Sequence, residues 1–301
     1  MSKERTRKRS SYHNIKSYDD ELELVRELLE AAEPYENAMN KEFEILLNKL
    51  VKLYEYNFPF YFKDGVNTKE LRKLRDSLMN GKAPQTEISR AIDEMKRDIR
   101  TLQVNLLTSW LIIDYEMTKE KTAQSLGLDP QSNIVMYFSN PEVRKEIISS
   151  SWCPDKKTYI DRVLANTRDM DIQLRKVILA GLQRGWSKER MSQILQNITG
   201  MAAYKADRLI RTETMAVWSK CTKEMYLEDG IEYVEIIGDA ICGGICTDFV
   251  GEVIPLREAE LGDDLPPYHP NCACSFCSYT EFPDEKNDTE DNFDEEDFDD
   301  F

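Results

Sequence analysis

The chain has 301 residues, of which 41% are hydrophobic and 32% charged, and its formal net charge is −16. This composition excludes a chain that is disordered throughout, and the length suffices for two modest globular domains or for one domain with extended helices. No apolar stretch approaches the roughly 20 residues of a membrane span, and the basic start lacks the apolar core of a signal peptide. We therefore expect a cytoplasmic protein with no membrane contact.

The two ends carry charges of opposite sign. Residues 1–18 begin with a run in which five Lys or Arg stand against one Glu, and we expect a disordered arm that contacts phosphates non-specifically or has no function. Residues 281–301 are expected to form a disordered acidic tail, because over 284–301 eleven acids against one lysine contribute −10 of the net charge. The tail either keeps the protein soluble, docks on a partner, or acts as a decoy for a basic nucleic-acid surface.

Residues 19–130 are predicted to form long helices. After Pro34, apolar side chains recur at three- and four-residue steps, which indicates one buried helix face. The sequence FPFYFKDG then predicts a break. Asn67, followed three residues later by Glu70, is typical of a helix start, and Gly81 of the end of that short helix.

The next predicted helix is the longest element of the chain. From Ile88 to Met117 apolar residues keep nearly heptad spacing, and Gly127 and Pro130 mark its end. About 40 residues at 1.5 Å each extend roughly 60 Å, which one compact domain of this size cannot cover. We expect this helix to pair antiparallel with the preceding helix or to present a face to another protein.

Residues 131–230 are predicted to form a further helical core. A helix in its middle ends at Gly185, and Ser187 is expected to cap a short helix that closes at Gly200. A long helix over 202–229 follows, and it ends before another glycine.

Three polar residues on this last predicted helix have expected partners. Asp207 and Arg211 stand four apart, so they are predicted to pair on the surface. Glu213 has apolar neighbours on its own face, so it points either to solvent or into a tertiary contact. We predict the tertiary contact, with the cysteine-bearing loop of the next region as a candidate partner.

Residues 231–280 are predicted to form a small β-rich lobe. The stretch 231–237 alternates in polarity and is rich in β-branched residues, and 248–256 is its expected hairpin partner. Gly243 and Gly244 permit a tight turn between the two strands. The fold class is therefore predicted as α+β, with a mainly α-helical body of long helices, a zinc-stabilised C-terminal lobe and the acidic tail.

Five candidate metal ligands gather in this lobe: Cys242, Cys246, His269, Cys272 and Cys274. Two local pairs of sulfur and imidazole donors separated by a loop are the usual way in which a chain supplies a tetrahedral zinc site. A Cys-x-Cys pair seldom supplies both sulfurs, so we favour the first four, with Cys274 as a substitute for His269 and Cys277 as an outside candidate. The alternative is a group of reduced cysteines packed in a small β-subdomain.

Such a zinc site is predicted to be structural, because four protein ligands leave no open coordination position. The sequence has neither the His-x-Glu element of a zinc deaminase nor a phosphate-binding glycine loop or Gly-x-Ser-x-Gly motif. Glu213 near a metal is the best enzymatic candidate, but an isolated carboxylate is weak support for a catalytic site. We expect a protein without enzyme activity.

Five motifs in chain order resemble the minor head protein (head morphogenesis, MuF-like) family of tailed bacteriophages. They are WCPDKKTYIDRVLANT, LxxxILAGLQRGWS, KADRLIRTETMAVW, DAICGGIC and HPNCAC. The resemblance covers roughly residues 150–277. The residues that match the family pattern are Arg211, Thr212, Glu213, Asp239, Cys242, Cys246, His269, Pro270, Cys272 and Cys274. The chain departs from that pattern with three residues between its first two cysteines, where the family has two, and with Ala273, where the family commonly has Arg.

The resemblance implies a virion or procapsid component, present in few copies, that binds the portal protein and acts in head assembly and in DNA packaging or delivery. Scaffold or major capsid protein, and DNA bound non-specifically through the basic arm and helical faces, are further candidate partners, and the host cytoplasm is the expected location during assembly. The alternative is a zinc-stabilised nucleic-acid-binding regulatory protein. Overall acidity weakens that alternative, because such modules normally carry a concentrated positive patch.

Overall fold

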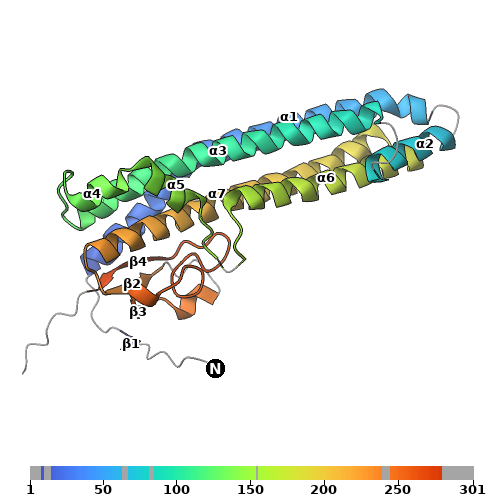
Figure 1. Cartoon of the computed structure of the whole chain (residues 1–301). Helices are drawn as coiled ribbons and strands as arrows, with labels where there is room; N and C mark the ends of the chain where they lie inside the picture. Colours follow the sequence, from blue (N-terminus) through green and yellow to red (C-terminus); the bar gives the residue numbers. More distant parts are fainter. Residues whose placement is uncertain are drawn as a thin grey trace, which may run out of the picture.

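The computed structural model describes residues 15–62, 67–80, 85–153, 155–238 and 245–279, together with the backbone of a two-residue strand near the N-terminus. A long bundle of helices carries a small sheet against one end (Figure 1). The four long helices are α1 (Ile15–Tyr61), α3 (Glu87–Ser125), α6 (Tyr159–Arg184) and α7 (Lys188–Glu228). The predicted α+β class, with long helices and a β-containing lobe near the C-terminus, is confirmed.

Shorter helices connect the long ones. They are α2 (Thr68–Arg75), the π-helical turn η1 (Asp76–Asn80), α4 (Asn133–Phe138) and α5 (Pro141–Ser149). The predicted start of α2 is confirmed, because the Asn67 side chain accepts a hydrogen bond from the backbone N–H of Glu70 at 3.3 Å. Gly81, the predicted end, lies outside the described residues.

Helices α1 and α3 lie side by side and run antiparallel (Figure 1), as the length of α3 predicts. Helix α1 is longer than predicted, because it begins at Ile15 and continues through Pro34 and Pro59. The prediction of a break at 58–65 is wrong for its first four residues, which are helical. Leu28 and Ala32 are fully buried before Pro34, so packing against the bundle maintains the helix across a residue that normally disrupts one.

Helix α7 is continuous, and the break predicted at Gly200 is wrong. Its predicted N-cap is confirmed, since Ser187 accepts a hydrogen bond from the backbone N–H of Arg190 at 3.3 Å. A glycine inside a helix costs only about 1 kcal/mol. The flanking Thr199 and Ala202 are buried in the bundle, and this packing offsets the cost.

Gly185 and Gly200 predict opposite responses to substitution by alanine. Gly185 has φ +62°, and an added Cβ would lie 2.3 Å from Cζ of Phe62, so Gly185→Ala should destabilise the protein by about 2 kcal/mol. At Gly200 an added Cβ meets nothing within 4 Å, so Gly200→Ala should stabilise it by about 0.5–1 kcal/mol. Urea unfolding followed by circular dichroism measures both, and equal signs would contradict the two assignments.

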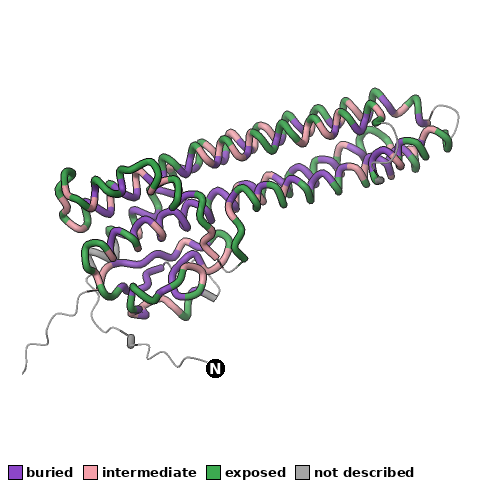
Figure 2. Tube along the Cα trace, viewed as in Figure 1, coloured by how far each residue is buried: buried purple, intermediate pink, exposed green. Residues whose placement is uncertain are grey.

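Buried positions run along the whole length of the bundle (Figure 2). Their apolar side chains form three large clusters. Both predicted regions, 19–130 and 131–230, contribute side chains to the first two clusters. The third cluster joins α1 and α7 to the sheet, where the rings of Trp218 and Phe276 lie 5.2 Å apart. The sheet therefore packs directly on the end of the bundle.

The sheet has the strand order β1-β3-β2-β4, and all neighbouring strands are antiparallel. The strands are β1 (Lys8–Arg9), β2 (Tyr233–Ile237), β3 (Glu252–Pro255) and β4 (Ser275–Tyr279). The predicted pairing of 231–237 with 248–256 is confirmed, with Val234 opposite Ile254. Strand β4 is absent from the predicted elements. It pairs with β2, so the loop that carries His269 leads directly into the sheet.

Candidate metal centre

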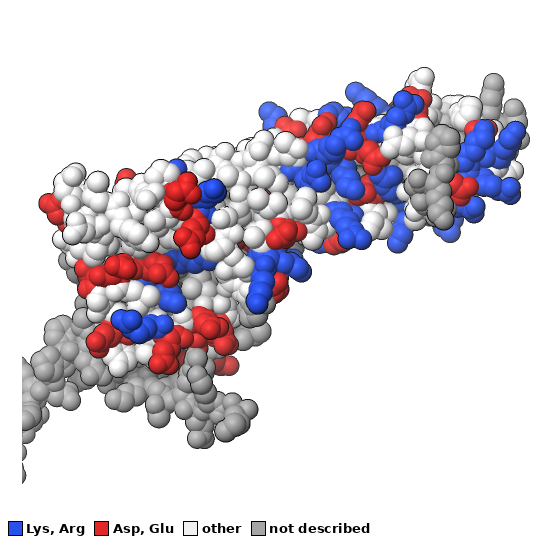
Figure 3. Space-filling view, viewed as in Figure 1, with Lys and Arg blue, Asp and Glu red and all other residues white. Residues whose placement is uncertain are grey.

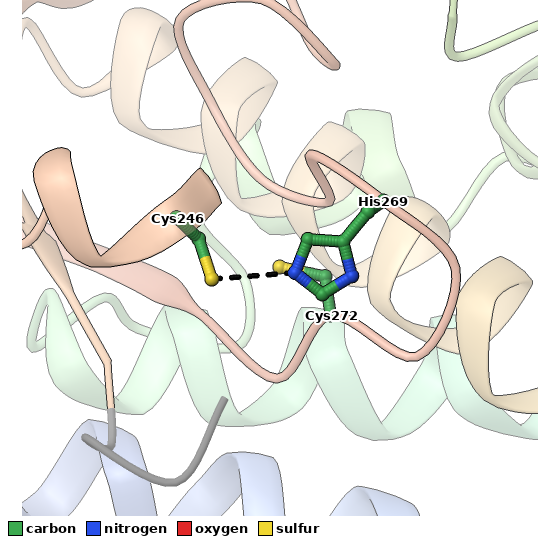
Figure 4. A group of neighbouring side chains, drawn as sticks. All are labelled: Cys246, His269 and Cys272. Atoms are coloured by element: carbon green, nitrogen blue, oxygen red, sulfur yellow. Dashed lines mark hydrogen bonds between the residues drawn. The ribbon is translucent and has the colours of Figure 1, made fainter. Parts of the chain in front are cut away.

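Three of the five predicted ligands converge at the edge of the lobe. Cys246 lies in the 3-10 turn η3 (Ile245–Asp248), and His269 and Cys272 lie in the loop that precedes β4. One ligand atom from each residue lies within 4.8 Å of the other two. The Sγ of Cys246 and the Nε2 of His269 are 3.3 Å apart and point toward each other (Figure 4).

The backbone of the loop explains why His269 and Cys272 meet. The N–H of Cys272 donates to the carbonyl of His269 at 3.1 Å, which closes a tight turn. Asn271 in this turn has φ 62°, a left-handed conformation that Asn tolerates better than most residues. The turn therefore presents the imidazole and the thiol to the same side.

The hydrogen bond of His269 Nδ1 determines which ring nitrogen carries the lone pair. Nδ1 lies 2.9 Å from the carbonyl oxygen of Pro270. A carbonyl only accepts, so Nδ1 carries the proton and the lone pair is left on Nε2. That lone pair faces Cys246 Sγ, and a backbone carbonyl behind the other ring nitrogen is the usual partner of a metal-binding histidine.

The donor set fits zinc in chemistry and spacing. Tetrahedral zinc with bonds of about 2.3 Å to sulfur and about 2.05 Å to nitrogen separates its ligand atoms by roughly 3.5–3.8 Å. The 3.3 Å between Cys246 Sγ and His269 Nε2 is close to this value. Cys246 and Cys272 are both essentially inaccessible to solvent. These residues fit three of four positions of a zinc site.

Local hydrogen bonds favour the metal-binding form of Cys272. A side-chain hydrogen bond with Cys274 is the main factor that lowers the pKa of the Cys272 thiol, and backbone hydrogen bonds of Tyr268 and Cys274 act in the same direction against burial. The thiolate is the form of cysteine that binds a metal. These hydrogen bonds therefore favour the thiolate of Cys272.

The fourth predicted ligand of the described part, Cys274, packs in one buried cluster with Cys246 and Cys272 and hydrogen-bonds to Cys272. Cys274 is buried next to Cys272, in contact range of Gly238, where an added Cβ would lie 2.9 Å from its Sγ. It is not among the residues whose ligand atoms all lie within 4.8 Å of one another. Cys277, the outside candidate, lies on β4 opposite Glu235 and is also outside the group. Cys242 lies outside the described residues.

Three consecutive residues of α7 bind three different elements. The Arg211 guanidinium contacts both carboxylate oxygens of Glu36 on α1, at 2.8 and 3.1 Å. The Thr212 hydroxyl accepts a hydrogen bond at 3.1 Å from the backbone N–H of Asn271, inside the candidate metal loop. Glu213 points to the segment between α5 and α6. The sequence Arg-Thr-Glu thus links α1, the metal loop and this segment.

The predicted pair of Asp207 and Arg211 is wrong. Arg211 binds Glu36, and Asp207 accepts a hydrogen bond from the side chain of Asn40 at 3.2 Å. Helix α1 covers this face of α7, so both side chains find partners there that a single-helix pattern does not reveal.

The tertiary contact predicted for Glu213 is confirmed, but the metal loop is not its partner. Its Oε1 accepts hydrogen bonds from Nε1 of Trp152 at 3.1 Å and from Arg162 at 3.3 Å. Burial raises the pKa of Glu213, and Trp152 and Arg162 oppose the rise. Burial also lowers the pKa of the nearby Lys220 to about 8. Nothing in the sequence pattern marked Trp152 or Arg162 as partners of this carboxylate.

Removal of the Glu213 carboxylate should destabilise the protein. Glu213→Ala leaves Arg162, whose side chain is 16% exposed, with the exposed Asp155 as its remaining ionic partner at 2.9 Å. We expect a loss of about 2–3 kcal/mol in the free energy of unfolding, because a mostly buried charge loses its buried partner. The matched control is Glu224→Ala on the exposed face of α7, which should change stability by less than about 0.5 kcal/mol. Equal effects in urea unfolding would show that the Glu213 contacts contribute nothing.

In comparisons with protein-family models, with curated proteins and with solved structures, nothing matches this chain. Among the described residues, every helix is too short or too polar to span a lipid bilayer.

Proposed function

We propose that this protein is a minor head protein of a tailed bacteriophage that binds the portal vertex and acts in head assembly and in DNA packaging or delivery. One observation supports this proposal most. Trp152 and Arg162 of the first motif contact Glu213 of the third, and its neighbour Thr212 contacts Asn271 of the last. Motifs that are far apart in the chain thus form one connected group of side chains.

The proposal includes a structural zinc ion. Cys246, His269 and Cys272 would supply three ligands, and Cys242 the fourth, with Cys274 as the substitute for His269. When bound, zinc would hold the turn at η3 against the loop before β4. A set of four protein ligands has no open position for a substrate. The best enzymatic candidate, Glu213, is already engaged by Trp152 and Arg162, which supports a protein that acts by contact.

Co-purification with the portal tests the proposed role. The full chain is co-expressed with the portal protein encoded in the same phage genome and isolated through an affinity tag on the portal. Native mass spectrometry should then show the portal ring with a few copies of this chain, and mass spectrometry of purified particles should detect it. If the chain neither binds the ring nor occurs in particles, the proposal fails. If the chain bound duplex DNA sequence-specifically and did not bind the portal, the alternative of a zinc-stabilised nucleic-acid-binding regulatory protein would be favoured.

A further inference from the structure

Charge is distributed unevenly along the bundle. Lys and Arg gather over the end far from the sheet, and Asp and Glu dominate near the sheet (Figure 3). On α1 the half next to the sheet carries seven acids and one arginine among its described side chains, from Asp20 to Glu36. A chain with a net charge of −16 thus presents a locally positive end.

We call this surface the basic end. It comprises eight exposed cations: Lys69, Arg72, Lys73, Arg75, Lys176, Arg184, Lys188 and Arg190. Three acids accompany them on the same segments: Glu70, Asp76 and Glu189. Within the part of the chain that the structure describes, five of the cations have no salt bridge: Lys69, Arg72, Lys176, Arg184 and Arg190. Their charge is available to a partner.

Packing brings these cations onto one region. Leu71 and Leu74 of α2 are buried in the same apolar cluster as Ile178 and Leu182 of α6. Helices α2 and α6 are therefore in contact, which places the α2 cations beside those of α6. The turn between α6 and α7 then adds the cations on both of its sides.

Trp186 in that turn holds two of the arginines. The guanidinium carbons of Arg184 and Arg190 lie 5.8 and 4.6 Å from the centre of its ring. An arginine over an aromatic ring keeps its N–H groups free to donate in the plane of the guanidinium, where they match phosphate oxygens. The indole therefore restricts the two side chains without neutralising them.

We infer that the basic end binds the phosphate backbone of duplex DNA. A protein partner is less suited, because the centres of protein interfaces are depleted of charged residues, whereas nucleic-acid interfaces are polar and strongly positive. Contacts to phosphates carry no base sequence, so the binding is non-specific. The inference deepens the proposed function and rests on it for the biological setting of DNA contact.

The basic end is separate from the N-terminal arm. Strand β1 (Lys8–Arg9) pairs with β3 in the sheet, at the opposite end of the bundle (Figure 1). The two basic regions can therefore be tested independently, because variants of one leave the other intact.

Fluorescence anisotropy with a labelled duplex of arbitrary sequence tests the inference on the full chain. The triple variant Arg72→Glu, Arg184→Glu, Arg190→Glu should bind at least about 10-fold more weakly near 100 mM salt. The slope of log K against log salt should fall by about 2.7, since each phosphate contact contributes about 0.9. Unchanged affinity and slope would overturn the inference.

Two control variants carry the same change in charge. One reverses exposed cations away from the basic end, Lys41→Glu, Lys145→Glu and Arg257→Glu, and the other reverses Arg5, Arg7 and Arg9 of the arm. The first control should bind DNA as the unchanged chain does, and a loss equal to that of the triple variant would overturn the inference. The arm control should keep the salt slope contributed by the basic end. If the arm variant lost all DNA binding, the inference would also be overturned. Should the triple variant not fold, its Gln counterpart replaces it, with the same expected direction.

The same binding measurement on a chain without residues 284–301 tests whether the acidic segment, and not DNA, is what binds the basic end. If DNA binds only after this acidic segment is removed, the segment itself occupies the basic end and DNA as the partner is overturned. Portal co-purification is measured without DNA, so a chain that binds the portal but not DNA overturns the inference here and leaves the proposed function standing.

Discussion

Cys272→Ser is expected to abolish zinc binding, from about one ion per chain to less than about a tenth. Cys272 is buried, hydrogen bonds favour its thiolate, and its sulfur is one of three ligand atoms that converge within 4.8 Å. Loss of one sulfur leaves an incomplete tetrahedron that serine does not restore, because a hydroxyl is a poor zinc ligand. Elemental analysis of protein purified without added metal measures the result directly.

The structural effect of metal loss should stay within the lobe. Zinc would join the η3 turn to the turn over 269–272, and we expect at least about 4 kcal/mol of lost local stability there. Strands β2 and β4 should persist, because Phe276 is buried against Trp218 and Tyr226 of α7. Hydrogen exchange should therefore increase at Cys246 and Cys272 and remain slow in α7.

Control variants separate the metal from general effects on folding. Cys277→Ser changes a buried thiol outside the converging group, and Cys153→Ser changes a partly exposed thiol between α5 and α6, so both should retain zinc. Cys274→Ser retains zinc if His269 is the ligand and loses it if Cys274 is the substitute. An unchanged chain that carries no stoichiometric zinc would refute the metal site, and the buried cysteines would then be simple packing residues.

The sequence predicts the long helices well where an apolar stripe and a cap coincide. The near-heptad run of α3, the cap at Asn67 and the cap at Ser187 all recur in the structure. The errors concern the predicted breaks at 58–65 and at Gly200, where the helix continues through Pro59 and through the glycine. A breaker costs about 1 kcal/mol for Gly and about 3 for Pro, and the burial of neighbouring side chains in a long bundle exceeds that cost. A single sequence does not show where such burial occurs.

In the candidate site too, contacts between residues near in sequence could be predicted, and contacts between distant residues could not. Cysteine and histidine spacing predicts the convergence of Cys246, His269 and Cys272, because two local pairs of donors are the pattern of a metal site. The partners of Arg211 and Glu213 do not follow from spacing: Glu36 lies 175 positions from Arg211, and Trp152 lies 61 from Glu213. Such contacts depend on how the helices assemble. An acidic residue with apolar neighbours on its helix face therefore indicates a tertiary contact, but the sequence does not show which residue makes it.

We expect the buried carboxyl group of Asp114 to have the largest effect on how the free energy of unfolding depends on pH. It lies on α3 between two hydrogen bonds to α7, from Trp110 to Thr214 at 2.7 Å and between Thr122 and Thr222 at 3.1 Å. Its side chain is fully buried, and neither carboxylate oxygen has a hydrogen-bond partner among the described residues. Burial raises its pKa well above the ordinary value, so the folded protein keeps this carboxyl protonated.

The direction of the pH dependence follows from where the proton is bound. Above about pH 4 the unfolded chain releases this proton while the folded chain retains it, so the folded state binds more protons. Stability then falls as pH rises, by about 1.4 kcal/mol per pH unit, until pH reaches the raised pKa of the folded state. The neighbouring thiol of Cys221 does not reverse this trend, because burial raises its pKa and keeps it neutral.

Asp114→Asn removes the titration and nearly preserves the shape of the side chain. Near pH 4 the variant should match the unchanged chain within about 1 kcal/mol, and by pH 6 it should be more stable by roughly 2–3 kcal/mol. Urea unfolding at several pH values measures the difference, in which the slope from Glu21, whose pKa burial raises to about 7, cancels because both chains retain it. Glu120→Gln on the exposed face of α3 is the control and should follow the unchanged chain. Parallel stability curves for Asp114→Asn and the unchanged chain would mean that the carboxylate is ionised and solvated inside the bundle.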